Sequence, residues 1–180
     1  MTVQDSGNRL RTIATLQAVA LVVVAASFWQ TVAAYPALPH TMAVHWSVAG
    51  QADGWAAKSW GKVLLLPLIQ AGTCLVLAGM SFWVAFSPGA LAYVNLPIDK
   101  SGLSDEQSLQ VRLLTAQGMS VINLLVLATL TYLNYVILRA AGSDRGPGSA
   151  ATMVTVLAGT AGILVTVTWL IRAVRRTARS

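Results

Sequence analysis

The chain has 180 residues, of which 56% are hydrophobic and only 10% are charged, and its mean hydropathy is +0.65. Soluble domains carry about 25% charged residues, so this composition excludes a soluble globular protein and indicates one that resides in the lipid bilayer. Lys and Arg outnumber Asp and Glu by 12 to 6, but they are scattered at the ends of apolar runs, which argues against a nucleic-acid partner.

Four apolar stretches are each long enough to cross a bilayer, whose hydrocarbon core takes about 20 residues of helix. They predict an all-α membrane protein with four transmembrane helices in an antiparallel bundle and an ordered extracytoplasmic loop between helices 1 and 2. The chain then divides into an N-terminus (1–12), a single transmembrane domain (13–174) and a basic tail (175–180). The spans are expected at about 13–34, 63–86, 118–138 and 150–171.

The first span also has features of a secretory signal, since Arg9 and Arg11 precede it and small residues follow at 32–34. Its apolar run is longer than the usual signal core of about 7–15 residues. We therefore expect it to remain as an uncleaved helix.

The distribution of Lys and Arg predicts the orientation in the membrane, because cytoplasmic loops carry an excess of these residues. The side that holds the N-terminus has eight of them: Arg9, Arg11, Lys100, Arg112, Arg172, Arg175, Arg176 and Arg179. The opposite side has four: Lys58, Lys62, Arg139 and Arg145. This bias places both termini in the cytoplasm of a bacterial cell and the first loop outside the plasma membrane.

A helix is expected to begin before the third span. Ser104 and Gln107 have the spacing of a capping box, and Asp105 and Glu106 place negative charge where a helix N-terminus favours it. A helix that runs from Asp105 into the span is longer than the bilayer requires, so its first turns should project beyond the hydrocarbon.

The spans contain no Asp, Glu, Lys or Arg, which disfavours a transporter or proton relay. Their amide side chains are expected to form interhelical hydrogen bonds, and their small residues are expected at close helix contacts. The amides are Gln17, Gln70, Asn123 and Asn134, and the small residues are Gly72, Gly79, Ala158 and Gly162.

The loop from Tyr35 to Lys62 has a different composition from the spans on either side. Two prolines hold its start extended, residues 42–46 alternate as a short strand would, and Asp53-Gly54 is a turn signal. A hairpin would bring Trp55 back toward His45. We predict a ligand-binding surface made of His45, Trp46, Asp53, Trp55 and Lys58.

Other readings of these loop residues stay open. His45 could simply brace the turn through a hydrogen bond to Asp53, and Trp60 with Lys62 could lie at the membrane interface. The two histidines are five residues apart with no Cys or Glu nearby, so no metal ligands are predicted. No nucleophile elbow, phosphate loop or paired-carboxylate pattern is present, so no catalytic residues and no cofactor are predicted.

The order of these residues resembles a known signature. Leu38-Pro39, Val44-His45-Trp46, Gly50, Asp53-Gly54-Trp55 and Lys58 are similar to the pattern of a bacterial family of multi-pass membrane proteins with domain of unknown function 1648, related to the SdpI-type immunity proteins. The family has proline at the position of Ala43 and asparagine at that of Ser47. A weaker similarity, to a cytoplasmic motif after the second span, covers Asn95, Pro97 and Lys100.

The resemblance implies a non-enzymatic sensor or immunity-like binding module that meets an extracytoplasmic peptide or protein through the outer loop. The alternative is an accessory subunit of a larger membrane complex, for which the small-residue faces would suit contacts with other helices or a second copy. A transporter or membrane enzyme is disfavoured by the uncharged spans.

The predicted orientation can be tested by cysteine accessibility. A cysteine placed at Ser143, in the loop between the third and fourth spans, should react with a membrane-impermeant maleimide added to intact cells, because that loop is expected outside. Reaction from the cytoplasmic side alone would show that the topology is inverted.

Overall fold

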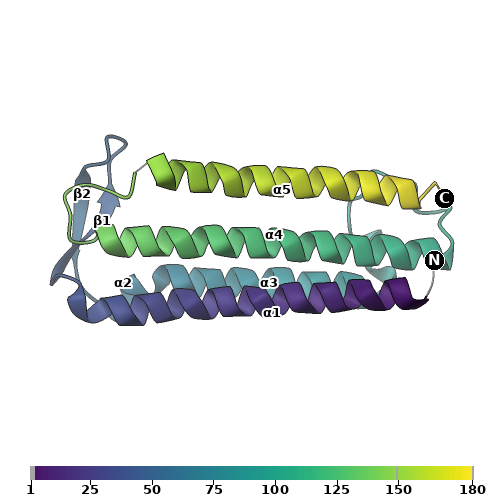
Figure 1. Cartoon of the computed structure of the whole chain (residues 1–180), viewed down its shortest axis with the longest axis horizontal. Helices are drawn as coiled ribbons and strands as arrows, with labels where there is room; N and C mark the ends of the chain where they lie inside the picture. The colour runs from purple at the N-terminus through teal and green to yellow at the C-terminus, as the bar shows by residue number, and fades with distance from the viewer. Residues whose placement is uncertain (1–2, 149, 180) are drawn as a thin grey trace.

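A computed structural model describes residues 3–148 and 150–179. Four long helices run side by side, and a β-hairpin lies at one end of the bundle, opposite the end that holds both termini (Figure 1). The long helices are α1 (Val3–Ala34), α3 (Leu65–Phe86), α4 (Asp105–Ala140) and α5 (Ala150–Thr177). The hairpin strands are β1 (Thr41–Trp46) and β2 (Ala52–Ala57), and the short helices are η1 (Tyr35–Ala37), α2 (Trp60–Val63) and η2 (Pro88–Ala92).

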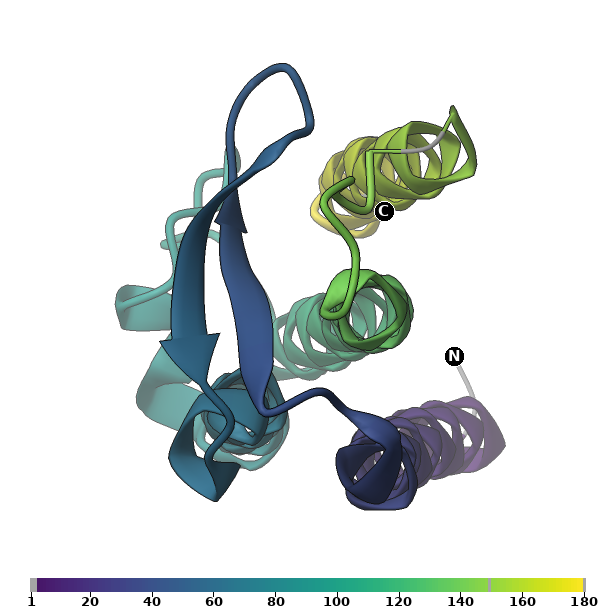
Figure 2. The same cartoon turned by 90° about the vertical axis from the view of Figure 1, so that its left-hand side faces the viewer.

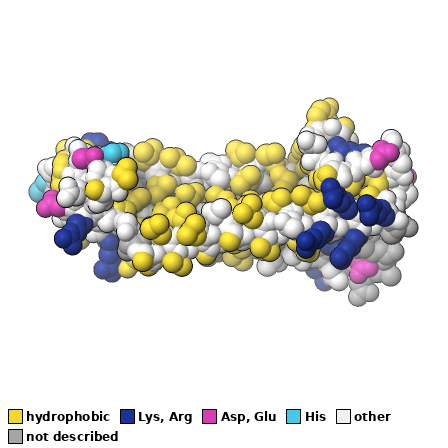
Figure 3. All heavy atoms as spheres, turned by 90° about the horizontal axis from the view of Figure 1, so that it is seen from above, with side chains coloured by type: hydrophobic (Ala, Val, Ile, Leu, Met, Phe, Trp, Pro, Cys, Tyr) yellow, Lys and Arg dark blue, Asp and Glu magenta, His cyan; other side chains and the backbone are white. Residues whose placement is uncertain are grey.

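Each predicted span lies within or largely within one of the four long helices, and all four are long and apolar enough to cross a membrane. The chain is therefore a multi-pass membrane protein, and the predicted fold class is confirmed. Figure 3 shows apolar side chains along the middle of the visible face and charged side chains toward its two ends. This banding is expected of a protein whose middle is surrounded by lipid.

Helix α4 begins where the sequence predicts. Ser104 and Gln107 form the expected capping box, in which the Ser104 N–H donates to Gln107 Oε1 at 2.8 Å and the Gln107 N–H donates to Ser104 Oγ at 3.2 Å. The helix then continues for 36 residues without a break. At the other end of the bundle α2 and α3 are separated at Leu64, three residues before Pro67.

Helix α4 lies at the centre of the arrangement, with α1, α3 and α5 around it (Figure 2). Helix α5 packs mainly against α4, and much of its surface is exposed apolar side chain. The bundle is therefore a three-helix core of α1, α3 and α4 with α5 attached to one side.

The amide side chains predicted to join helices do so, and each of these bonds has one partner in α4. Gln17 of α1 donates to Ser120 Oγ at 2.9 Å and accepts from Asn123 Nδ2 at 2.9 Å. Gln70 of α3 donates to the carbonyl of Leu127 at 2.7 Å. Such bonds are favoured in a bilayer because the hydrocarbon offers no other partner.

A second amide bond lies closer to the hairpin end. Asn134 of α4 donates to Thr31 Oγ1 at 2.9 Å and to the carbonyl of Ser27 at 3.3 Å, both in α1. With the bond from Arg9 Nη1 to Gln117 Oε1 at 2.9 Å, polar bonds hold the α1–α4 contact at several levels and limit how far one helix can slide along the other.

The prediction for the small residues is wrong at three of its four positions. Gly72 and Gly79 have open space where a side chain would lie, and Ala158 is exposed. Gly162 does contact Leu125 of α4, and the neighbouring Gly159 lies against Thr129. Spacing within one apolar helix does not reveal which face meets a neighbour, because all faces are apolar.

The hydrogen bond between Gln17 and Asn123 predicts a measurable stability. In Asn123→Ala the side-chain oxygen of Gln17, Oε1, loses its hydrogen-bond donor inside the bundle. The free energy of unfolding should therefore fall by about 0.6–2 kcal/mol. Equilibrium unfolding of the full chain in mixed detergent micelles measures this change. Asn8→Ala, at an exposed position of α1, is the matched control and should change little; equal losses in both variants would contradict the assignment.

Candidate functional site

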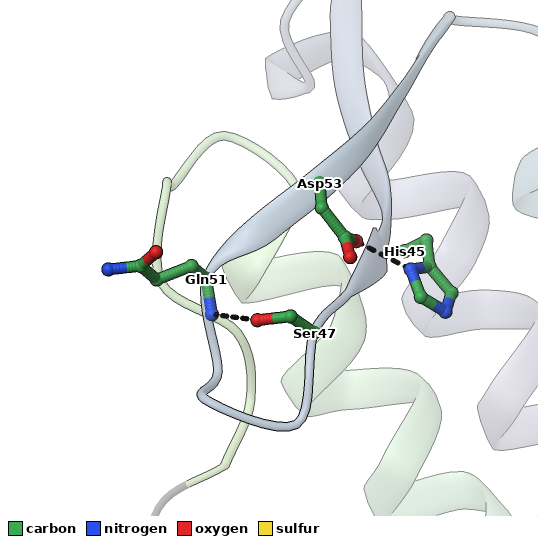
Figure 4. Close-up of polar contacts among 4 residues, drawn as sticks. All are labelled: His45, Ser47, Gln51 and Asp53. Atoms are coloured by element: carbon green, nitrogen blue, oxygen red, sulfur yellow. Dashed lines mark hydrogen bonds and ion pairs between the residues drawn. The ribbon is translucent and has the colours of Figure 1, made fainter.

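The hairpin is built around a tight turn and two irregular strand positions. Gly50 adopts φ +77°, which favours glycine, and its N–H donates to the Ser47 carbonyl at 2.8 Å. Ser47 Oγ accepts from the Gln51 N–H at 3.3 Å, as Figure 4 shows. The serine that replaces the asparagine of the resembled pattern therefore still braces the turn with its side chain.

The two irregular positions decide where His45 points. Ala43 pairs with Trp55 and His45 with Gly54, so Val44 is an extra residue in β1, while Asp53 is an extra residue in β2 between Gly54 and Ala52. In a regular strand Ala43 and His45 would share one face. The bulge at Val44 breaks this alternation, since Ala43 is 3% exposed and the His45 side chain is 72% exposed.

His45 and Asp53 form a pair on the exposed side of the hairpin. Their Nδ1 and Oδ1 atoms lie 2.5 Å apart, and Figure 4 shows the carboxylate directed at the imidazole. The predicted brace between these residues is present, but both side chains remain largely open to solvent. A polar pair in that setting adds little to stability.

Gly54 makes this pairing feasible. A Cβ at Gly54 would lie 2.8 Å from His45 Cβ and could not be accommodated without a shift of the strands. A glycine is therefore required at position 54 so that β1 and β2 can approach closely at His45.

The other predicted site residues have different surroundings. Trp55 is 46% exposed. Trp46 turns toward the body of the protein, where it packs so closely on Gly146 that a Cβ there would lie 2.7 Å from the indole ring. The structure thus brings His45, Asp53 and Trp55 to the solvent-exposed part of the hairpin and directs Trp46 inward.

Lys58 acts as an internal clamp. Its ammonium donates to the carbonyls of Leu38 at 2.8 Å and Tyr35 at 3.3 Å, and it lies 5.0 Å from the centre of the Tyr35 ring. The Tyr35 ring in turn stacks on Trp60 with 3.6 Å between ring centres. Lys58, which follows β2, therefore joins the end of the hairpin to the segment before β1.

The loop between α4 and α5 also holds the hairpin, which the sequence does not predict. Ala43 N–H donates to the Ala141 carbonyl at 2.9 Å, and Ala52 N–H donates to the Asp144 carbonyl at 2.8 Å. Gln51 and Arg145 form an isolated antiparallel bridge. These bonds join the hairpin to a segment about 100 residues away, and no pattern in either segment signals them.

The Ala43 bond explains one departure from the resembled signature. A proline at this position has no N–H and could not donate to the Ala141 carbonyl. The alanine of this chain therefore adds an attachment that the proline pattern lacks.

The second predicted motif lies at the opposite end of the bundle. Lys100 donates to the carbonyls of Val94 at 2.6 Å and Leu91 at 2.7 Å, while Asn95 and Pro97 are exposed. Nearby, hydrogen bonds from the Ser101 side chain and backbone lower the pKa of Asp99. Lys100 therefore closes the loop after η2, as Lys58 closes the loop before β1.

In residues 3–148 and 150–179, no three His, Cys, Asp or Glu side chains are grouped closely enough to hold a metal ion. Cys74 is buried in α3. The exposed side chains of the hairpin include an imidazole–carboxylate pair and an aromatic ring.

Comparison with known protein families gives a match to part of the chain. Residues 22–71, from the middle of α1 to the beginning of α3, match a domain of unknown function, DUF1648. The matched segment contains the complete hairpin. Searches against curated proteins and against solved structures give no match.

The close contact at Gly54 predicts the effect of adding one methyl group. Gly54→Ala should displace His45, loosen the hairpin and lower the free energy of unfolding by about 1–3 kcal/mol, as overpacking does. Thermal unfolding combined with limited proteolysis of the hairpin measures both effects. Gly61→Ala is the control, because Gly61 has open space around it; equal proteolysis of the two variants would argue against the contact.

Proposed function

We propose that this chain, with its DUF1648 domain, is a non-enzymatic binding module of the bacterial plasma membrane, a sensor or immunity-like protein that recognises an extracytoplasmic peptide or protein through the hairpin. The main observation behind the proposal is that the side chains of His45 and Asp53 form an exposed pair, on a hairpin that the rest of the fold holds in place.

Rigid attachment supports a recognition role. The hairpin is bonded at Ala43 of β1 to the end of α4, at Ala52 of β2 to the α4–α5 loop, and through Lys58 to Tyr35 of η1. A surface that is ordered before binding loses less conformational entropy when a partner arrives. A loop that served only to connect α1 and α3 would not need these attachments.

The composition of the exposed surface also supports the proposal. Trp55 supplies apolar contact area of the kind that dominates binding hot spots, while His45 and Asp53 supply a donor and an acceptor that orient a partner. In this proposal Trp46 and Lys58 are positioning residues: Trp46 seats the hairpin on Gly146 and Lys58 secures its two ends.

A second function is favoured by helix α5. The exposed apolar residues of this helix, which include Met153, Leu157 and Leu164, form a long surface that could contact another membrane protein. In that case the chain is an accessory subunit of a larger complex, and the hairpin caps the bundle.

Photo-crosslinking in native membranes separates these two functions. A benzophenone amino acid is placed in the full chain at Trp55 of the hairpin, at Leu164 of α5, or at the exposed Trp29 of α1 as the lipid-facing control. The binding module predicts a discrete crosslinked product from position 55 that falls about tenfold when His45→Ala is added, as expected for a contact worth roughly 1.4 kcal/mol.

The fold of each variant is checked by its thermal unfolding. A product from position 164 and none from position 55 would favour the accessory subunit. A product from position 55 that is unchanged by His45→Ala would remove His45 from the recognition surface.

A further inference from the structure

A cavity of about 310 Å³ lies between the hairpin, the start of α3 and the end of α4. Its volume is at the lower end of the range of about 300–1,000 Å³ that is usual for small-molecule sites. The wall is mainly apolar and includes Met42 and Ala43 of β1, Leu66 of α3, and Ile137 and Leu138 of α4. A space of this size and lining favours an apolar occupant, because an empty one forfeits packing contacts.

Three polar side chains line this mainly apolar cavity: Trp46, Lys62 and Asn134. The Asn134 amide donates to α1, and the indole nitrogen of Trp46 has almost no accessible surface, so neither presents a donor to the space. The ammonium of Lys62 makes one hydrogen bond, to the Ala57 carbonyl at 3.0 Å, on the exposed side. The site therefore offers one positive charge beside an apolar space.

The cavity is continuous with the lipid-facing surface. Leu65 belongs to its wall and is 58% exposed, and the next turn of α3 continues the same surface with Leu68 and Ile69, which are 55% and 52% exposed. The cavity thus lies where the apolar helices meet the polar hairpin. A hydrocarbon chain can reach it from the bilayer without crossing water.

We propose that this cavity binds one acyl chain of an anionic phospholipid. The chain fills the apolar space, and the phosphate lies beside Lys62. A phospholipid combines an apolar chain with a negative charge, which match the apolar wall of the cavity and the ammonium at it. The inference does not rest on the proposed recognition role of His45 and Trp55.

Lipid retention by the full chain tests the proposal. The protein is purified in detergent and titrated with phosphatidylglycerol or phosphatidylcholine, and bound lipid is counted by native mass spectrometry. The wild type should retain one phosphatidylglycerol at several-fold lower lipid concentration than phosphatidylcholine. Val44→Trp, which places a large ring at the cavity, should weaken retention about tenfold.

Val48→Trp is the matched control, since Val48 is an exposed valine of the same hairpin that does not line the cavity, and it should bind as the wild type does. Lys62→Gln should remove the preference for the anionic lipid while chain binding persists. If Val44→Trp fails to fold by circular dichroism, Ile137→Trp fills the cavity from α4 instead and carries the test.

Three results would overturn the proposal. Retention by Val44→Trp or Ile137→Trp equal to that of the wild type would place the lipid elsewhere, or leave the cavity to an apolar side chain of a peptide partner. Equal retention of the two lipids by the wild type would exclude the charge-specific site. A loss as large in Val48→Trp as in Val44→Trp would show that the effect does not arise from the cavity.

Discussion

Side-chain hydrogen bonds to helix α4 are the interaction on which the rest of the structure depends. Burial of apolar surface does not drive helices together inside lipid, because the lipid tails are as apolar as the side chains. Gln17, Gln70 and Asn134 instead connect α1 and α3 to α4 through polar bonds. These bonds set the register of three helices, and the end of α4 then provides a fixed point for everything at the hairpin end.

The hairpin lies outside the apolar part of the bundle and is held in place by the helices described above. Its strands are bonded to Ala141 and Asp144 of the segment that follows α4, so the hairpin is positioned by the central helix as well as by its own flanking helices. An isolated two-stranded hairpin is marginally stable in water. The bonds to the end of α4 and those of Lys58 supply the stability that the two strands lack. The exposed residues of the hairpin, His45, Asp53 and Trp55, are therefore not needed to hold it in place.

Two distinct surfaces result from this arrangement. The exposed part of the hairpin carries His45, Asp53 and Trp55, and the space beneath it, lined by Trp46 and the ends of α3 and α4, has the character of a lipid site. Strand β1 contributes to both surfaces, because the bulge at Val44 separates the inward Ala43 from the outward His45. A lipid in the cavity would support the strand that presents His45.

The sequence by itself determined the four spans, the start of α4, the interhelical role of the amides and the existence of the hairpin, because these follow from local composition and from the cost of unpaired polar groups in lipid. It also brought His45 and Asp53 together, since a turn between them leaves few arrangements. Only the tertiary structure decided which glycines meet a neighbour, that Trp46 and Lys58 face inward, and that the α4–α5 loop holds the hairpin. Those features depend on a strand bulge and on backbone hydrogen bonds between residues about 100 positions apart. Because nearly every residue has the same backbone groups, the sequence does not show which of them will pair.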